Sequence, residues 1–180
     1  MERGHTLQHL FEIRIKGTIE AVWAEITKRG AVQRPLMDSV LVSDLRPGSP
    51  FKYLSSDGRY WFVRGTILEA APPRRLVHTF ETSWSKDPPS RVTWELETMG
   101  EEVRVRVLHD RFESATETYR GVRDGWSKIL GSLKRWIETG DIGLGTKLFY
   151  AFFRLQRPFL PLSAREGQGS GPSGRAGRPR

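Results

Sequence analysis

Cysteine and asparagine are both absent from this chain of 180 residues. The lack of cysteine excludes disulfides, thiolate zinc sites and cysteine nucleophiles, and it is typical of a protein in a reducing compartment. The first sixteen residues alternate polar and apolar side chains instead of forming an apolar run, so we expect no secretory leader. We therefore expect a cytoplasmic protein.

Recognisable catalytic motifs are missing as well. The chain contains neither the HExxH pattern of zinc hydrolases nor the G-x-S-x-G turn that presents a nucleophilic serine. Residues 143–147 read Gly-Leu-Gly-Thr-Lys, which resembles part of a phosphate loop but lacks its spacing and a preceding strand. We accordingly predict no metal site and no cofactor, and we assign no catalytic residue.

Charge is unevenly distributed along the chain. Residues 1–141 contain 22 Lys and Arg against 20 Asp and Glu, whereas residues 142–180 contain 7 against one. Most of the formal net charge of +8 therefore lies in the C-terminal part. Specific nucleic-acid binding requires basic residues gathered on one face of a domain, so the nearly neutral first part argues against it.

Alternation of polar and apolar residues predicts that much of the chain is β-strand. Residues 10–16 place Phe11, Ile13 and Ile15 on one face, and a short helix capped by Thr18 follows. Six further strands, separated by turns rich in Gly and Pro, are predicted over residues 38–44, 51–55, 60–69, 75–84, 91–98 and 102–110. Connections this short imply an antiparallel meander.

A long amphipathic helix is predicted after the strands. Between Ser114 and Gly140, apolar residues recur at spacings of three and four, namely Val122, Trp126, Ile129, Leu130, Leu133 and Ile137. The concave face of the sheet is the one partner large enough for this stripe. We therefore predict an α+β fold over residues 1–141, in which a curved antiparallel sheet of six or seven strands wraps around this long C-terminal helix.

Segment 63–77 reads VRGTILEAAPPRRLV, and its glycine, double proline and leucine resemble a signature of the SRPBCC superfamily. More narrowly, it resembles the branch named after the activator of the Hsp90 ATPase. Residues 21–23 in the first helix and 125–126 in the long helix agree with this resemblance, which covers about residues 8–141. The resemblance implies the helix-grip fold of START-type lipid-transfer domains and polyketide cyclases. It also implies a cavity between sheet and helix that commonly holds hydrophobic ligands.

A bent sheet around one helix encloses either a filled core or a pocket, and large aromatic side chains suit both. His78 and His109 are the candidate general bases of this core, although a buried histidine is more often a hydrogen-bonded core residue. From strand parity and helical position, the predicted cavity-lining residues are Trp61, Val63, His78, Phe80, Trp94, Val105, His109, Trp126, Leu130 and Leu133.

A second amphipathic helix, with excess basic charge, is predicted within residues 142–162. As a helix, residues 144–157 separate a basic side, which also carries Tyr150, from a broad apolar side. The candidate surface residues are Lys147, Phe149, Phe152, Phe153, Arg154 and Arg157. We favour packing of the apolar side on the domain itself or on a second copy over contact with a membrane surface. Residues 163–180, rich in Gly, Ser, Pro and Arg, are predicted to be disordered.

Three functional hypotheses follow from these features. The favoured one is a non-enzymatic binding module for a small hydrophobic molecule, such as a lipid, held between the sheet and the long helix. The second is a protein-interaction or co-chaperone-like module, alone or as a homodimer, that uses the outer sheet or the 144–157 helix. The third is a pocket enzyme of the cyclase or isomerase type that depends on His78 or His109. No residue pattern identifies the ligand.

Overall fold

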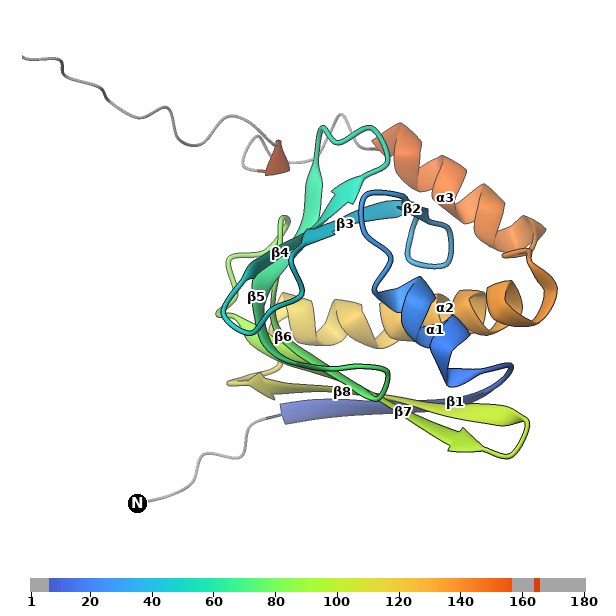
Figure 1. Ribbon diagram of the computed structural model, residues 1–180. Helices are drawn as coiled ribbons and strands as arrows, with labels where there is room; N and C mark the ends of the chain where they lie inside the picture. Colours follow the sequence, from blue (N-terminus) through green and yellow to red (C-terminus); the bar gives the residue numbers. More distant parts are fainter. Residues whose placement is uncertain (1–6, 157–163, 166–180) are drawn as a thin grey trace, which may run out of the picture.

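A curved sheet of antiparallel strands makes up much of the described chain, and a long helix lies along its concave side (Figure 1). The computed structural model describes residues 7–156, without the side chain of Phe153, and residues 164–165. The strands are β1 (Leu7–Lys16), β2 (Val32–Gln33), β3 (Ser39–Ser43), β4 (Pro50–Ser55), β5 (Trp61–Ala71), β6 (Arg75–Thr82), β7 (Ser90–Met99) and β8 (Glu102–Phe112). The helices are α1 (Ile19–Ile26), α2 (Glu117–Thr139) and α3 (Leu144–Gln156).

The strands follow the order β1-β8-β7-β6-β5-β4-β3-β2 across the sheet. Strands β2 to β8 are thus neighbours in both sequence and space, and β1 closes the other edge by antiparallel pairing with β8. The predicted α+β class and antiparallel meander are confirmed. The described sheet has eight strands instead of six or seven, because the stretch after α1 contains β2. Two residues are too few to show an alternating pattern.

Local chemistry fixes the helix ends. The Thr18 hydroxyl accepts a hydrogen bond from the Ala21 N–H at 3.2 Å and caps α1 as predicted. Helix α2 begins after Thr116, slightly later than predicted, and the Asp87 carboxylate adds a second cap by accepting from the Thr118 N–H at 2.8 Å. Burial alone would raise the pKa of Asp87, but hydrogen bonds led by that of Thr118 outweigh it and lower the pKa. Helix α2 ends at Gly140, whose φ of 73° lies in the left-handed region.

The core fills much of the space between the concave face and α2. The alternation of β8 buries Val103, Val105 and Val107 completely, whereas Arg104 and Arg106 lie on the opposite face. Trp94 of β7 is only 1% exposed, and its ring lies edge-on to that of Trp126, with ring centres 5.2 Å apart. Helix and sheet are therefore joined by aromatic contacts as well as by aliphatic packing.

Gly65 allows strands β4, β5 and β6 to approach closely. A Cβ atom at this position would lie 2.2 Å from the carbonyl oxygen of Thr79 and 2.6 Å from the ring of Phe51. Both distances are below van der Waals contact, and the carbonyl belongs to backbone that is held in the β6–β7 ladder. The Phe51 ring in turn contacts His78, with ring centres 4.3 Å apart. A side chain at residue 65 would thus disturb the inner face of the sheet.

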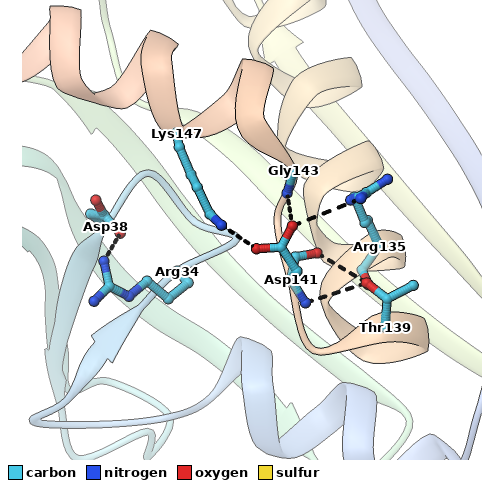
Figure 2. Close-up of polar contacts among 7 residues, drawn as sticks. All are labelled: Arg34, Asp38, Arg135, Thr139, Asp141, Gly143 and Lys147. Carbon is cyan, nitrogen blue, oxygen red and sulfur yellow. Dashed lines mark hydrogen bonds and ion pairs between the residues drawn. The ribbon is translucent and has the colours of Figure 1, made fainter.

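A polar cluster holds the corner between α2 and α3 (Figure 2). The Asp141 carboxylate accepts from the Gly143 N–H at 2.8 Å and pairs with Lys147 of α3 at 2.5 Å. Arg135 of α2 approaches the same carboxylate at 3.8 Å. The hydrogen bond from Lys147, followed by that from Gly143, lowers the pKa of Asp141. The helices are therefore joined by a charged cap on an exposed turn.

Helix α3 packs on the domain through Tyr150, opposite to the expected orientation. Tyr150 is 3% exposed; its hydroxyl donates to the Pro35 carbonyl at 3.0 Å and accepts from the Met37 N–H at 3.2 Å. The helix consequently lies beside β2 (Figure 1). Four apolar residues of the other side, which we call the α3 stripe, are 60–74% exposed, namely Leu144, Leu148, Phe152 and Leu155. The expected packing of this apolar side on the domain is therefore wrong for these four residues, and packing on a second copy stays a prediction.

Some predictions for the C-terminal part fall outside the described residues. Arg157 and the side chain of Phe153 are among them, as is most of the segment 163–180 that is predicted to be disordered. Within that segment the structure describes Ala164, which is buried, and Arg165, which forms a β-bridge with Tyr60. None of the helices in the described ranges has the length and apolar character that crossing a membrane requires.

Candidate functional site

A cavity of about 350 Å³ lies between the concave face of the sheet, the first half of α2 and the loop before β3. The sheet contributes Ser39, Tyr53, Phe62, Val63, His78, Phe80, Thr82 and Trp94. The helix contributes Thr118, Gly121, Val122, Gly125, Trp126 and Ile129. Leu36, Met37 and Trp84 come from loops. The volume suits a small organic molecule, and mainly apolar walls with a few polar groups are typical of such sites.

Half of the predicted cavity residues line this space, namely Val63, His78, Phe80, Trp94 and Trp126. Val105, Leu130 and Leu133 instead belong to the packed core, with exposures of at most 2%. Leu130 and Leu133 lie on the apolar stripe of α2 but beyond the section that faces the cavity. Sequence periodicity identifies the buried side of a helix and gives no information on where the packing opens.

Trp61 does not line the cavity because a β-bulge changes the parity of β5. Val63 lies opposite Tyr53 while Trp61 lies opposite Leu54, so Phe62 is the extra residue of the pair. Phe62 and Val63 both reach the cavity wall as a result. Trp61 instead lies beside Arg64, whose guanidinium carbon is 4.7 Å from the centre of the indole ring.

The sequence analysis did not predict several residues of the wall, although strand alternation or helical spacing could have identified some of them. Thr82 continues the inward parity of His78 and Phe80 on β6. Gly121 and Gly125 lie one turn apart on α2, on the same side as Trp126 and Val122. Leu36 and Met37 lie in an irregular loop and had no periodic signal; the hydrogen bonds of Tyr150 hold this loop in place.

His109 is a structural residue that joins α2 to the sheet. The Trp126 indole N–H donates to His109 Nδ1 at 3.0 Å, so Nε2 carries the proton and donates to Ser90 Oγ at 2.8 Å. Ser90 can then donate to the Phe80 carbonyl at 3.3 Å. Burial, with smaller contributions from His78 and His9, lowers the pKa of His109 to about 3. Both ring nitrogens are therefore occupied, and His109 is not available as a general base.

His78 differs because it lines the cavity. Its Nδ1 donates to the Thr79 carbonyl at 2.8 Å, which leaves Nε2 as an unprotonated acceptor. Burial lowers the pKa of His78 to about 4, even though the hydrogen bond to Thr79 acts in the opposite direction. At neutral pH, His78 therefore presents a neutral hydrogen-bond acceptor on a wall that is otherwise largely aromatic.

Thr82 is the most unusual polar group of the wall. The residue is 5% exposed, and Oγ1 is buried with no hydrogen-bond partner among the described residues. Leaving a buried hydroxyl unsatisfied costs about 1–3 kcal/mol. Tyr53 adds a second hydroxyl-bearing side chain to the wall, and burial raises its pKa, so the phenol stays neutral.

Charge is absent from the described cavity wall, because none of its residues is Asp, Glu, Lys or Arg. Nowhere in the described ranges do three or more His, Cys, Asp or Glu side chains gather in a way that could hold a metal ion. The wall can therefore bind and orient a molecule by apolar contact and a few neutral hydrogen bonds. It offers no group that is ionised near neutral pH.

The outer face of the sheet has a different character. Cross-strand ion pairs cover it, including Arg91 with Asp110 at 2.5 Å and Arg64 with Glu81 at 3.1 Å. Its exposed apolar residues, such as Leu10 and Leu68, lie on strands far apart in the sheet. A face of this kind is typically solvated. It gives no support to the hypothesis that the outer sheet is a docking surface.

Comparison with known proteins agrees with this architecture. Residues 16–138 match the family described as Activator of Hsp90 ATPase homolog 1-like protein. Among solved structures, CalU16 from Micromonospora echinospora is 22% identical, with a TM-score of 0.62, and the match covers 82% of this chain and 83% of CalU16. The Aha1 dimer from Colwellia psychrerythraea is 18% identical, with a TM-score of 0.62 over 74% of this chain and 98% of that one.

DynU16, a protein in the dynemicin biosynthetic locus, is also 18% identical with a TM-score of 0.62. That match covers 74% of this chain but only 48% of DynU16. Identities this low establish a shared fold and nothing about shared activity. A search of curated proteins finds no match. The family match ends at residue 138, so α3 lies outside it.

Proposed function

This chain belongs to the family of Activator of Hsp90 ATPase homolog 1-like proteins, and on that premise we propose that it binds a small, mainly apolar molecule in the cavity between the sheet and α2. The observation that carries the proposal is the cavity itself, with Phe62, Phe80, Trp94 and Trp126 on its walls. A neutral aromatic enclosure of this kind favours apolar ligands.

The apolar lining of the cavity supports a ligand over imperfect packing, because an apolar molecule that binds there removes the aromatic walls from contact with water. The wall also contains Gly121 and Gly125, each of which destabilises a helix by about 1 kcal/mol relative to alanine. A Cβ at either position would meet nothing within 4 Å.

Substitution of Gly125 by leucine tests the site. The new side chain should enter the cavity without a clash at its Cβ and should favour the helix. We expect the affinity for the neutral dye N-phenyl-naphthylamine, followed by its fluorescence on transfer to an apolar site, to fall at least about tenfold, a loss of about 1.4 kcal/mol. The melting temperature should stay unchanged or rise.

Gly131→Leu is the matched control. Gly131 lies on the same helix, also has open space around its Cβ, and does not line the cavity. It should leave dye binding unchanged. Equal dye affinity in the wild type and both variants would place the dye elsewhere and contradict the proposed site. Native mass spectrometry of the purified protein, before and after denaturation, would then show whether any molecule is retained.

A second candidate function concerns the α3 stripe, and we infer that it rests on an anionic membrane surface. The stripe residues recur at spacings of four, four and three, so they form one side of the helix. The basic residues of α3 are Arg154 and Lys147, the latter paired with Asp141, and the helix itself contains no acidic residue. Lys128 of α2 lies over the ring of Phe149 at 4.3 Å. An exposed apolar side with flanking cations is typical of a helix that lies in the interface of an anionic bilayer.

Vesicle flotation tests this second candidate. The protein should float with vesicles of phosphatidylglycerol and phosphatidylcholine and much less with phosphatidylcholine alone. The double variant Leu148→Glu/Phe152→Glu should lose flotation, because it places two charges on the apolar side. Leu68→Glu/Val42→Glu, which alters exposed apolar residues of the sheet, is the control. A dimer in solution that only the α3 variant dissociates would instead make the stripe an interface between two copies.

A further inference from the structure

The loop between β2 and β3 forms part of the cavity wall and has a strained backbone. Leu36 and Met37 line the cavity from this loop. Met37 and Asp38 have φ angles of 61° and 51°, in the left-handed region that residues other than glycine rarely adopt. Two successive residues in this conformation persist only where surrounding contacts hold them. The contacts that hold this loop therefore determine the shape of one wall of the cavity.

Tyr150 of α3 supplies contacts to the middle of this loop. Its hydroxyl donates to the Pro35 carbonyl at 3.0 Å and accepts from the Met37 N–H at 3.2 Å, so it bonds the residues on either side of Leu36. Burial raises the pKa of Tyr150, and the hydroxyl therefore keeps the proton that it donates. Within the loop, the Leu36 carbonyl accepts from the Ser39 N–H at 3.2 Å and from the Ser39 hydroxyl at 2.5 Å. One side chain of α3 thus completes the hydrogen bonding of a cavity wall.

Helix α3 is in turn attached to α2. Its first turns are held by the ion pair of Lys147 with Asp141 at 2.5 Å and by Lys128 of α2, which lies 4.3 Å from the ring centre of Phe149 (Figure 2 shows the ion pair). The helix lies beyond residues 16–138, which match the family. A segment outside the family match therefore reaches the cavity wall through the loop between β2 and β3.

We propose that Tyr150 is a positioning residue of the binding site, through which α3 holds Leu36 and Met37 in the arrangement that the ligand contacts. This inference rests on the cavity being the binding site proposed above. A wall that is already ordered binds a ligand without the cost of ordering a mobile loop. Affinity therefore depends on Tyr150, although Tyr150 itself does not line the cavity. Because a coupling free energy is reciprocal, bound ligand also holds the loop more firmly against α3.

The variant Tyr150→Phe keeps the ring and removes the hydroxyl that bonds the loop. We expect its affinity for N-phenyl-naphthylamine to fall about fivefold or more, the effect of about one net hydrogen bond. Most of the loss should appear as faster dissociation of the dye in stopped-flow dilution. Ile15→Val is the matched control, because Ile15 is fully buried and does not line the cavity, and loss of its methyl group costs a comparable amount of stability. It should leave the affinity and the dissociation rate unchanged, which separates positioning of the loop from a general loss of stability.

Hydrogen exchange of the wild-type protein tests the reciprocal effect without a variant. Saturating dye should slow exchange of the Met37 N–H, which donates to Tyr150, at least about fivefold. The Ser49 N–H, which donates to the Arg46 carbonyl at 2.9 Å in the turn between β3 and β4, is the control and should exchange at the same rate with and without dye.

Three results would overturn the inference: equal dye affinity and dissociation rate in the wild type and Tyr150→Phe, an equal loss of affinity in Ile15→Val, or Met37 exchange that dye does not slow. The proposed function would stand in each case if Gly125→Leu still weakens dye binding. Unchanged dye affinity in Gly125→Leu would instead contradict the cavity as the binding site, and this inference with it.

Discussion

Acidification from about pH 6.5 to about pH 4.5 is expected to lower the free energy of unfolding by about 5 kcal/mol. The cause is two buried histidines that stay neutral in the folded protein, where the pKa of His78 is about 4 and that of His109 is about 3. In the unfolded chain both titrate near pH 6.5. Between these values the unfolded state binds more protons, so each pH unit costs about 1.4 kcal/mol per histidine.

Acid lowers stability through both the histidines and the carboxylates, and only the pH window distinguishes the two contributions. Histidine-linked stability is complete above pH 6.5 and is lost as the pH falls toward 4 and then 3. Asp87, Glu138 and Asp141 have lowered pKa values, so their contributions are present above the unfolded values and are lost only below about pH 4.5. The window between about pH 6.5 and 4.5 therefore reports on the two histidines.

Urea denaturation across this window provides the measurement. The variant His109→Gln can still accept from Trp126 and donate to Ser90 but does not titrate, so it should reduce the slope of stability against pH by about half. Combination with His78→Leu should remove most of the remaining slope. A wild-type protein whose unfolding free energy is constant over this range would contradict the assignment of both histidines as buried and neutral.

Gly65→Ala is expected to cost about 3 kcal/mol or more of stability. The added methyl group would lie 2.2 Å from the Thr79 carbonyl oxygen and 2.6 Å from the Phe51 ring. Neither neighbour can move freely, because Thr79 is held in the β6–β7 ladder and Phe51 is 2% exposed. Overpacking of this kind typically costs about 1–3 kcal/mol, and a contact with backbone lies at the upper end.

Gly131→Ala is the appropriate comparison for this prediction. Its Cβ would meet nothing within 4 Å, and its helical position makes alanine more favourable by about 1 kcal/mol. Urea denaturation should therefore show opposite shifts for the two glycine variants. Equal stabilities would mean that the strands can separate at Gly65 without loss. A Gly65 variant that remains folded should also bind the naphthyl dye more weakly, because Phe51 contacts the cavity residue His78.

Gly65 gives a physical reason for one part of the sequence resemblance. The glycine of segment 63–77 is part of the pattern that indicates the family, and the structure explains it by the approach of the Thr79 carbonyl. The sequence shows that a glycine is present but not why it is needed, since the two residues that a side chain would contact, Phe51 and Thr79, lie on β4 and β6. Strand pairing is required to bring them together.

The identity of the cavity wall was only half predictable, and three mechanisms explain four of the five errors. Trp61 was misplaced because one bulge shifts the parity of β5. Leu130 and Leu133 were misplaced because the buried stripe of α2 extends past the open section into packed core. His109 was misplaced because its ring nitrogens are taken by Trp126 and Ser90, which turns a candidate base into a structural link. Each mechanism depends on contacts between distant segments.

The sequence by itself determined the order and type of nearly all elements, since alternation, helical spacing, Thr18 and Gly140 act over a few residues. Tertiary structure alone decided which face of α3 is buried. Tyr150 turns inward because its hydroxyl bonds the backbone of Pro35 and Met37, 115 and 113 residues away, and the leucines of the same helix remain outside. Tertiary structure also decided where the core stays open, because a cavity forms where the curved sheet and α2 lie too far apart for their side chains to fill the space. Local sequence patterns contain no information about that separation.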